Sequence, residues 1–386
     1  MQNLALVYET VFPEFKGGVE RWFLELSSEL VKSGTKVKYL NTSGIREERH
    51  GVQFVSMLNK ESNFHISGKR TVFNTLQYTY ITFKHFLKNK YDTVYVSSFP
   101  FLHIFVIKIA LLIGRRETLL VCDWFEVPSK NFWEKTYGKI LGKVGFFLQI
   151  ITVKVPDINF TYLDSTYSQV RDNARLLQKV IKLPGIIPQN LLTKNNLMFE
   201  DPIDICQIGR LTQDKRPLLS LQVVLKLKNK GWLGKFWIVG SGPLIDDIQD
   251  YIVINELSET VIVLDNANDS KMAEILSNCG LLFHPSRREG FGLVVIESAC
   301  MGVPSVVIES EDNKIPELGI NPNLVAHTLD IEVLSEYVFE GLKNRSKYTQ
   351  ECISWKNNIA PRLTSAASIT EIARIINSEI ESRKEL

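Results

Sequence analysis

The sequence has few cysteines and no excess of either charge sign, and these two absences exclude several classes of protein. Its five cysteines show no C-x-x-C spacing, which argues against a disulfide framework and a zinc-binding cluster. Lysine and arginine number 45 against 43 acidic residues, a net charge of +2. A nearly neutral chain is not a strongly basic nucleic-acid binder. We therefore expect reduced thiols in a cytoplasmic protein without a nucleic-acid partner.

Long hydrophobic runs are also absent. The most apolar stretch, residues 101–113, is interrupted by His103 and Lys108 and is well short of the roughly 20 residues that cross a bilayer. The N-terminus lacks the basic region and cleavage site of a signal peptide. We predict no transmembrane helix and no secretion.

What is present is an ordinary globular composition, 45% apolar and 23% charged, in a chain of 386 residues, which suits two domains. The charge is unevenly divided along the chain. Residues 1–186 carry 25 lysines and arginines against 16 acidic residues, a net charge of +9, and the remainder is −7. The positive half is therefore expected to face something negative.

The hydrophobic pattern alternates between strands and helices. Leu4 to Tyr8 is a short apolar run typical of a buried strand, and an amphipathic stripe from Val19 to Leu30 follows, which Gly34 ends. A second strand at Lys36 to Leu40 completes a parallel strand–helix–strand unit. The alternation breaks around Pro184-Gly185 and restarts at Ile203.

This pattern predicts two doubly wound parallel-sheet domains of the α/β class, facing each other across a cleft that binds the ligand. We assign residues 1–186 to a first Rossmann-like domain and 187–202 to a linker. Residues 203–360 form a second Rossmann-like domain, and 361–386 form a closing helix that packs on one of the two.

Two turns of the second half could bind phosphate. Arg210 and Lys215 follow a predicted strand, where a guanidinium and an ammonium can hold a diphosphate; solvated surface cations are the alternative. Gly240 and Gly242 lie in a Gly-Ser-Gly-Pro turn that opens a helix, where backbone amides can approach an anion. A purely steric turn explains these glycines equally well.

The most informative stretch runs from His284 to Glu297. A buried strand ends there, and Gly290, Phe291 and Gly292 precede a helix that begins near Leu293. Glu289 and Glu297 flank this turn, and paired carboxylates suit ligands rich in hydroxyl groups. A structural glutamate that caps a neighbouring loop is the alternative for Glu297.

These residues together resemble the retaining glycosyltransferases of the GT-B fold, in family 4, the "glycosyl transferases group 1" type. The resemblance rests on E-x7-E at Glu289 and Glu297, P-S-R-R-E-G-F-G at 285–292 and S-A-C-M-G-V-P at 298–304. The G-R-L and G-S-G-P turns and K-G-G-V-E at Lys16 to Glu20 occur in the same order as in the family.

The resemblance also implies roles. Gly17 and Gly18 would approach the donor phosphates, while Arg210 and Lys215 would hold the diphosphate. Glu297 would bind the ribose, and Glu289 would contact the donor sugar together with Phe291 and Gly292. The attack would come from the face that the diphosphate leaves, with neither a metal nor another cofactor. Glu289, Arg210 and Lys215 are thus the expected catalytic residues.

One departure from the family affects the first domain. Relatives often have a histidine before an aspartate on a strand that lines the cleft, where this chain has Cys122 and Asp123. Asp123 is the candidate on the acceptor side. Lysines 135, 139, 143 and 154 alternate with Tyr137, Phe146 and Phe147, a pattern that suits peripheral contact with an anionic membrane, at the inner face of the membrane. The six histidines show no metal-ligand spacing and are interpreted as packing or surface residues.

The sequence therefore predicts a retaining, metal-independent hexosyltransferase that uses a nucleotide diphosphate sugar (UDP- or GDP-sugar) and a glycan or lipid-linked acceptor, in cell-surface polysaccharide or glycolipid biosynthesis. Two alternatives stay open: a nucleotide-sugar epimerase on the same fold, and a non-catalytic partner that binds nucleotide sugar or glycan.

Overall fold

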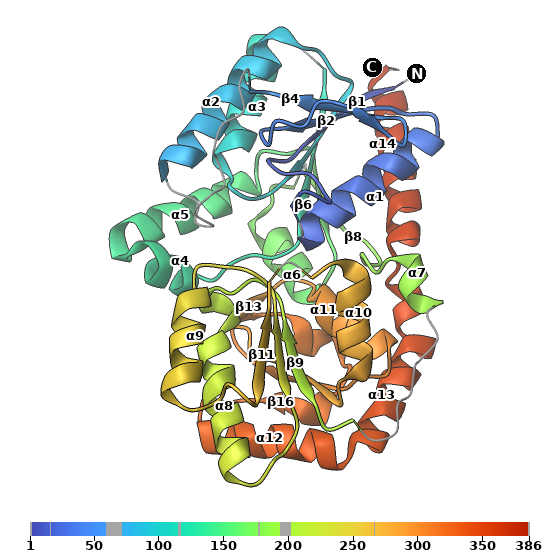
Figure 1. Ribbon diagram of the computed structural model, residues 1–386. Helices are drawn as coiled ribbons and strands as arrows, with labels where there is room; N and C mark the ends of the chain where they lie inside the picture. Colours follow the sequence, from blue (N-terminus) through green and yellow to red (C-terminus); the bar gives the residue numbers. More distant parts are fainter. Residues whose placement is uncertain are drawn as a thin grey trace. The chain divides into compact units, whose positions relative to one another are not determined.

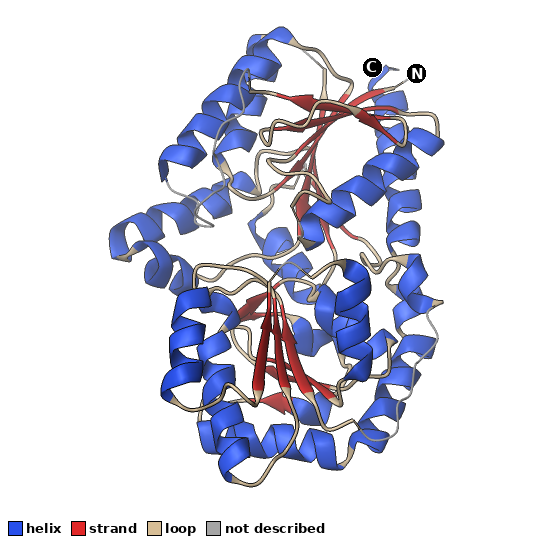
Figure 2. Ribbon diagram, viewed as in Figure 1, coloured by secondary structure: helices blue, strands red, loops and turns tan. Residues whose placement is uncertain are grey.

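The computed structural model describes residues 2–15, 17–58, 72–114, 117–176, 178–193, 202–265 and 267–384. The chain divides into two compact units (Figures 1 and 2). Unit 1 comprises Met1–Ile186 and Thr364–Leu386, and unit 2 comprises Ile187–Leu363. The predicted linker, residues 187–202, thus belongs to unit 2. The C-terminal helix is part of unit 1.

Unit 1 is built on an eight-stranded sheet of order β3-β4-β2-β1-β5-β6-β7-β8, parallel except for the β3–β4 pair. Its central strands are buried along nearly their whole length, as expected of parallel strands covered on both faces. The strands are β1 (Asn3–Val7), β2 (Lys36–Asn41), β3 (Glu48–Arg49), β4 (Val52–Ser56), β5 (Thr93–Ser97), β6 (Leu119–Trp124), β7 (Ile158–Thr161) and β8 (Lys179–Lys182). The helices are α1 (Gly18–Lys32), α2 (Val72–Lys88), α3 (Leu102–Ile113), α4 (Lys130–Tyr137), α5 (Lys139–Thr152), α6 (Asp164–Asn173) and α14 (Ser365–Lys384).

Helix α1 confirms the amphipathic stripe. Trp22, Phe23, Leu26 and Leu30 are buried, and Gly34 follows the helix with a φ of 89°, which a side chain would strain. Helix α14 joins the same unit through its serines. Ser368 donates to the Gly185 carbonyl (2.6 Å) and accepts from the Gly185 amide (3.0 Å). The last helix is therefore bonded to the end of the first Rossmann-like segment.

Unit 2 contains a six-stranded, wholly parallel sheet of order β11-β10-β9-β12-β14-β16. Its strands are β9 (Ile205–Ile208), β10 (Phe236–Val239), β11 (Val261–Leu264), β12 (Leu281–His284), β14 (Ser305–Ile308) and β16 (Val325–Ala326), with a small pair β13 (Arg288–Glu289) and β15 (Asp312–Asn313). The helices are α7 (Gln189–Leu192), α8 (Pro217–Asn229), α9 (Ile245–Ile254), α10 (Asp269–Asn278), α11 (Leu293–Cys300), α12 (Ile331–Lys343) and α13 (Arg345–Asn358), with 3-10 turns η1 (Gln213–Lys215), η2 (Ile315–Leu318), η3 (Pro322–Leu324) and η4 (Ala360–Arg362).

The predicted α/β class with two parallel sheets is confirmed. The order of strands places the ends of β9 and β12 side by side in the middle of unit 2, where the loops that carry the candidate residues begin. All five cysteines are buried free thiols, as expected from their spacing.

Candidate functional site

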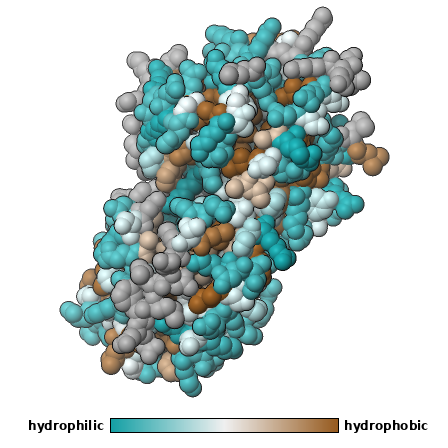
Figure 3. All heavy atoms as spheres, turned by 90° about the vertical axis from the view of Figure 1, so that its right-hand side faces the viewer, coloured by the Kyte–Doolittle hydropathy of each residue, from teal (hydrophilic) through white to brown (hydrophobic). Residues whose placement is uncertain are grey.

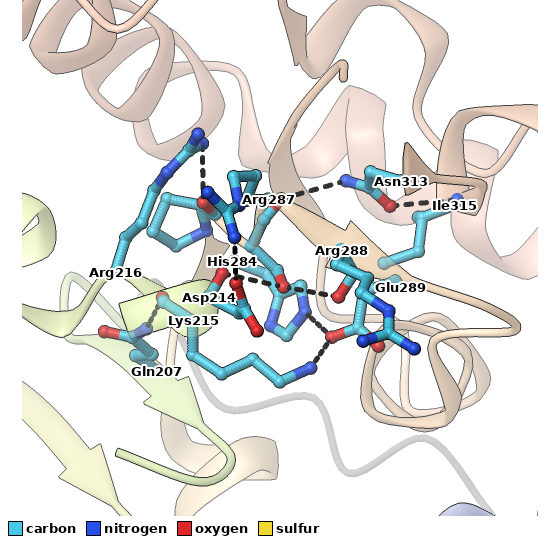
Figure 4. A network of polar contacts seen from close by, with 12 residues as sticks. Gln207, Asp214, Lys215, Arg216, His284, Arg287, Arg288, Glu289, Asn313 and Ile315 are labelled. Atoms are coloured by element: carbon cyan, nitrogen blue, oxygen red, sulfur yellow. Dashed lines mark hydrogen bonds and ion pairs between the residues drawn. The ribbon is translucent and has the colours of Figure 1, made fainter. Parts of the chain in front are cut away.

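The loops that follow β9 and β12 meet in unit 2 (Figure 4). The backbone amide of Arg287 donates to the carbonyl of Asp214 (2.7 Å), and the Arg287 guanidinium pairs with the Asp214 carboxylate (2.7 Å). Gln207, on β9, donates from its side chain to the carbonyl of Lys215 (2.7 Å). These bonds fix the turn that carries Lys215 against the loop that carries Glu289.

Three charged or polar side chains converge at this junction. The Lys215 ammonium pairs with Oε1 of Glu289, and Nε2 of His284 lies 2.7 Å from the same oxygen. The side chains of Lys215 and Glu289 are 17% and 14% exposed, and His284 is 2% exposed. The fold therefore brings the Lys215 cation together with the His284 imidazole at the end of β12 and the Glu289 carboxylate just after it, more than 60 residues further along the chain.

The pKa of Glu289 is about 2. Burial alone would raise it, but the charge of Lys215 and the hydrogen bond and charge of His284 outweigh that effect and lower the pKa. Glu289 is thus an ionised carboxylate at neutral pH. Such a group accepts hydrogen bonds, whereas a general acid or base needs a pKa near the working pH.

A second layer holds the Glu289 loop. Its short strand β13 pairs with β15, and the Glu289 carbonyl accepts from the Lys314 amide (2.9 Å). Asn313 donates to the carbonyls of Ile308 (2.7 Å) and Ser286 (3.3 Å), and its Oδ1 accepts from the Ile315 amide. The loop is therefore fixed by backbone bonds rather than by the ion pair alone.

Helix α11 begins directly after this loop. Gly292 is its N-cap with a φ of 63°, and a Cβ there would lie 2.4 Å from the Ile315 side chain, so the position requires glycine. Phe291 is buried, while Gly290 and Leu293 are partly buried. Glu297 lies in the second turn of α11, as the sequence predicts, and its side chain is half-buried.

The glycines of the Gly-Ser-Gly-Pro turn have a packing role. A Cβ at Gly240 would lie 2.0 Å from the Gly209 carbonyl oxygen, and one at Gly242 would lie 2.4 Å from that of Leu211. The Leu211 amide also donates to the Ser241 carbonyl (2.8 Å). The two turns that follow β9 and β10 are therefore packed backbone to backbone, which supports the steric interpretation of these glycines.

The remaining candidates belong to other segments of the chain. Arg210 is solvent-exposed just past β9. Gly17, the N-cap of α1, and Gly18, the first residue of α1, lie in unit 1, and a Cβ at Gly17 would lie 2.1 Å from the Glu20 carboxylate. Lys16, part of the same motif, falls outside the described residues.

Asp123 lies near the end of β6 and is fully buried. Its carboxylate accepts from Tyr95 (2.7 Å), Tyr162 (2.8 Å) and the Trp22 indole (2.9 Å). Burial raises its pKa to about 7, although the three hydrogen bonds lower it. Asp123 is therefore enclosed by these three partners and does not reach solvent.

His284 is the residue that sequence reasoning missed. The sequence pattern indicates a packing or surface residue there, because no second histidine is spaced for a metal. The available signal was its position as the last residue of a buried strand, five residues before Glu289. In the part of the chain that the structure describes, no cluster of three potential metal ligands occurs, and no helix is long and apolar enough to cross a membrane.

Comparison with known proteins shows what the chain is similar to. Residues 189–357 match the family described as "Glycosyl transferases group 1". The chain is 23% identical over 329 residues to the phosphatidylinositol N-acetylglucosaminyltransferase gpi3 subunit of Schizosaccharomyces pombe, over 81% of this chain and 67% of that protein. Other curated relatives are matched over less than half of their own length.

Solved structures show the fold. Sucrose-phosphate synthase of Thermosynechococcus elongatus superposes with a TM-score of 0.77 at 13% identity, over 99% of this chain and all of that one. HepE of Anabaena, solved with UDP and glucose, superposes with a TM-score of 0.70 at 14% identity, over 98% of this chain and all of that one. The chain therefore has the GT-B fold of glycosyltransferases.

Proposed function

We propose that this chain, whose residues 189–357 belong to the glycosyl transferases group 1 family, is a retaining family 4 enzyme that moves a hexosyl group from a nucleotide diphosphate sugar to an acceptor hydroxyl. The observation that carries the proposal is the pairing of Lys215 with Glu289 at the ends of β9 and β12, with Glu297 eight residues further on in α11.

Glu289 serves as a hydrogen-bond acceptor for the donor sugar. A carboxylate with a pKa near 2 holds no proton at neutral pH, so it binds hydroxyl groups rather than protonating the leaving group. Glu297 binds the vicinal hydroxyls of the ribose, and the backbone around Gly290 and Gly292 approaches the sugar.

Lys215 and Arg210 stabilise the departing diphosphate. An ammonium has three N–H donors, so Lys215 can keep Glu289 and still donate to a phosphate oxygen. Arg210 is exposed and able to form a bidentate pair with the diphosphate. Two cations placed where negative charge develops can replace a metal ion in this role. Gly17, Gly18, Gly240 and Gly242 remain proposed donor-binding positions.

The acceptor is proposed to be a glycan or a lipid-linked saccharide in cell-surface polysaccharide or glycolipid synthesis. Two observations support this class. The relative in S. pombe is named as a subunit of a phosphatidylinositol N-acetylglucosaminyltransferase. Another relative, of Erwinia amylovora, is named as an amylovoran biosynthesis glycosyltransferase. The net charge of +9 in residues 1–186 also favours an anionic acceptor.

Calorimetric titration with UDP, GDP and ADP, without added metal, tests the donor site. We expect one nucleotide to bind selectively and Glu297→Ala to weaken it at least tenfold, because the ribose loses its acceptor. Glu336→Ala, an exposed glutamate of α12, is the matched control. No binding of any of the three nucleotides would contradict the proposal.

Product analysis then separates the reactions. Incubation with the matching UDP- or GDP-hexoses and saccharide acceptors should release nucleotide and give an α-linked product from an α-linked donor. An epimeric nucleotide sugar formed without any acceptor would identify an epimerase. Binding without either product would indicate a non-catalytic partner.

A further inference from the structure

One side of unit 1 is unusually rich in exposed apolar side chains. Helices α2 and α3 pack together and α3 contacts α5, so that the three form one layer (Figure 1). Among the described residues, 11 of the 20 large apolar side chains that are exposed lie on these helices. They are Phe73, Leu76, Tyr80 and Leu87 on α2, Ile109, Leu112 and Ile113 on α3, and Ile140, Leu141, Val144 and Phe147 on α5. We call this surface the α2–α3–α5 face.

The charge of this face has one sign. The three helices contain no aspartate or glutamate and carry five lysines: Lys84, Lys88, Lys108, Lys139 and Lys143. Two described carboxylates of neighbouring segments are already paired, Asp157 with Lys108 (3.1 Å) and Glu134 with Lys130 (3.8 Å). The opposite side, which carries α1 and α14, is mainly hydrophilic, with apolar residues scattered over it (Figure 3).

The structure also shows which of the aromatic residues in this region are exposed to solvent. Of the aromatic residues singled out in the sequence, Tyr137 and Phe146 pack against the core of unit 1, whereas Phe147 is 61% exposed. Ile140, one turn before Val144 on the same helix, is 81% exposed. Helices α2 and α3, which the sequence pattern did not point to, supply the rest of the face.

We propose that the α2–α3–α5 face docks on an anionic lipid bilayer. Apolar side chains that insert among the acyl chains, next to lysines that meet anionic headgroups, are the composition of an interfacial surface. Protein–protein interfaces instead are depleted in lysine. The absence of any carboxylate on the three helices matches a negatively charged surface and would serve no purpose against a second copy of this face.

Vesicle co-sedimentation tests the proposal independently of transferase activity. The whole chain should bind phosphatidylcholine vesicles that contain phosphatidylglycerol, and bind pure phosphatidylcholine vesicles far more weakly. Ile140→Asp with Phe147→Asp should reduce binding at least tenfold, and Lys139→Glu with Lys143→Glu should do the same, since each lysine near the surface is worth about fivefold. High salt should weaken the remaining binding.

A matched control lies on α9, where Val253 and Ile254 are 70% and 77% exposed. Val253→Asp with Ile254→Asp should bind vesicles as the wild type does, with circular dichroism confirming that all variants fold. Equal binding by all variants, or no binding of the wild type to anionic vesicles, would overturn the proposal. A wild-type dimer in sedimentation that Ile140→Asp with Phe147→Asp dissociates would assign the face to a second copy instead.

The contact between His284 and Glu289 carries a second inference, which rests on the proposed function. Because Glu289 is ionised, Nε2 of His284 must carry the proton and donate it to Oε1. Lys215 donates to the same oxygen. Nδ1 of His284 is buried without a hydrogen-bond partner among the described residues, so Glu289 is the partner that fixes the ring.

We infer that His284 is a positioning residue for Glu289. Two donors on Oε1 fix the carboxylate and leave Oε2 to accept from a hydroxyl of the donor sugar. The ring is 2% exposed, so it acts through Glu289 and does not itself touch the ligand. A leucine of similar size would keep the packing and lose the donor, whereas glutamine would keep an N–H.

Comparing the affinities for a nucleotide sugar and for the free nucleotide diphosphate distinguishes positioning of Glu289 by His284 from a general structural role. His284→Leu should weaken the nucleotide sugar at least tenfold and change the affinity for the free nucleotide diphosphate less than twofold, because only the sugar contacts Glu289. His284→Gln should recover most of the loss. The control is His327→Leu, which removes an exposed histidine paired with Glu309.

Three outcomes are distinguishable. Equal weakening of nucleotide and nucleotide sugar by His284→Leu would show a general structural defect and overturn the inference. So would unchanged binding of both ligands. If the wild type binds no nucleotide sugar at all, the proposed function itself fails.

Discussion

Each unit places a carboxylate that is largely shielded from solvent near the end of a parallel strand, and the two carboxylates have pKa values shifted in opposite directions. Glu289 in unit 2 has a pKa of about 2, and Asp123 in unit 1 has a pKa of about 7. Burial raises the pKa of both. The difference lies in the partners, because Glu289 meets the Lys215 cation whereas Asp123 meets three neutral donors.

This comparison indicates that Glu289 is suited to binding a ligand, whereas Asp123 is suited to stabilising the fold. A carboxylate that stays charged next to a cation, partly open to solvent, can exchange partners with a polar ligand. A carboxylate enclosed by two tyrosines and a tryptophan satisfies those buried donors and links α1 to β5, β6 and the end of β7. Four predictions test the contrast, from the largest expected effect to the smallest.

Removing the Lys215 cation should destabilise the folded protein, because Glu289 loses the charge that keeps it ionised. Lys215→Met leaves Glu289 without its charge partner, and we expect a loss of about 4 kcal/mol in the free energy of unfolding at neutral pH. Urea unfolding measures it. The double variant Lys215→Met with Glu289→Gln should recover most of the stability, since no uncompensated charge remains. A single variant as stable as the wild type would show that the pair contributes nothing.

Arg210 should affect turnover and leave stability unchanged. Its side chain is exposed, so Arg210→Ala should unfold like the wild type. Turnover should fall about a hundredfold, on the order of 3 kcal/mol of transition-state stabilisation, if the guanidinium acts as one preorganised donor to the diphosphate. Steady-state rates measure this, with Arg171→Ala as a control on α6. Unchanged turnover would remove Arg210 from the site.

Asp123 should give the protein a stability that falls as pH rises. The folded state keeps a proton on Asp123 up to about pH 7, whereas the unfolded chain releases it near pH 4, so the folded state binds more protons between these values. We expect about 2 kcal/mol of stability to be lost from this group between pH 5 and pH 7. Asp123→Asn should flatten that slope, and Asp172→Asn, an exposed control, should not.

Glu289 should give the protein a stability that falls as pH falls, the opposite of the effect of Asp123. Its lowered pKa stabilises the folded state fully above the ordinary glutamate pKa of 4.5, and this stabilisation is lost as the pH falls toward 2. We expect about 1 kcal/mol to be lost between pH 4.5 and pH 3.5, and Glu289→Gln should remove that part of the acid sensitivity. Urea unfolding across this range is the measurement. An unchanged acid profile in the variant would mean that Glu289 is not held as an ion pair.

Most of the fold was predictable. Strands β1 and β2 begin and end within one residue of the predicted runs Leu4 to Tyr8 and Lys36 to Leu40, because buried parallel strands have continuous apolar runs. The partner of the last helix was not predictable. An apolar stripe from Ile369 to Ile376 indicates that the helix packs, and only contacts with distant segments show that it packs on unit 1. The bonds of Ser368 to Gly185 and of Ser365 to Glu25 are two of them.

The candidate site was predictable in part. The E-x7-E spacing pointed to Glu289 and Glu297, and both lie where expected, in the loop after β12 and in α11. Asp123 is a candidate because of the family resemblance, but its burial depends on Trp22, Tyr95 and Tyr162, which come from three other segments. His284 was missed because nothing local to its sequence says which oxygen its ring will meet.

The sequence by itself determined the elements, their alternation and the residue types in each loop, since these follow from local periodicity and turn chemistry. Only the tertiary structure decided which charges meet. Lys215 and Glu289 are separated by 74 positions and become neighbours because β9 and β12 are adjacent in the sheet. Electrostatic energy depends on the distance between two charges and on their burial, and the local sequence determines neither of these.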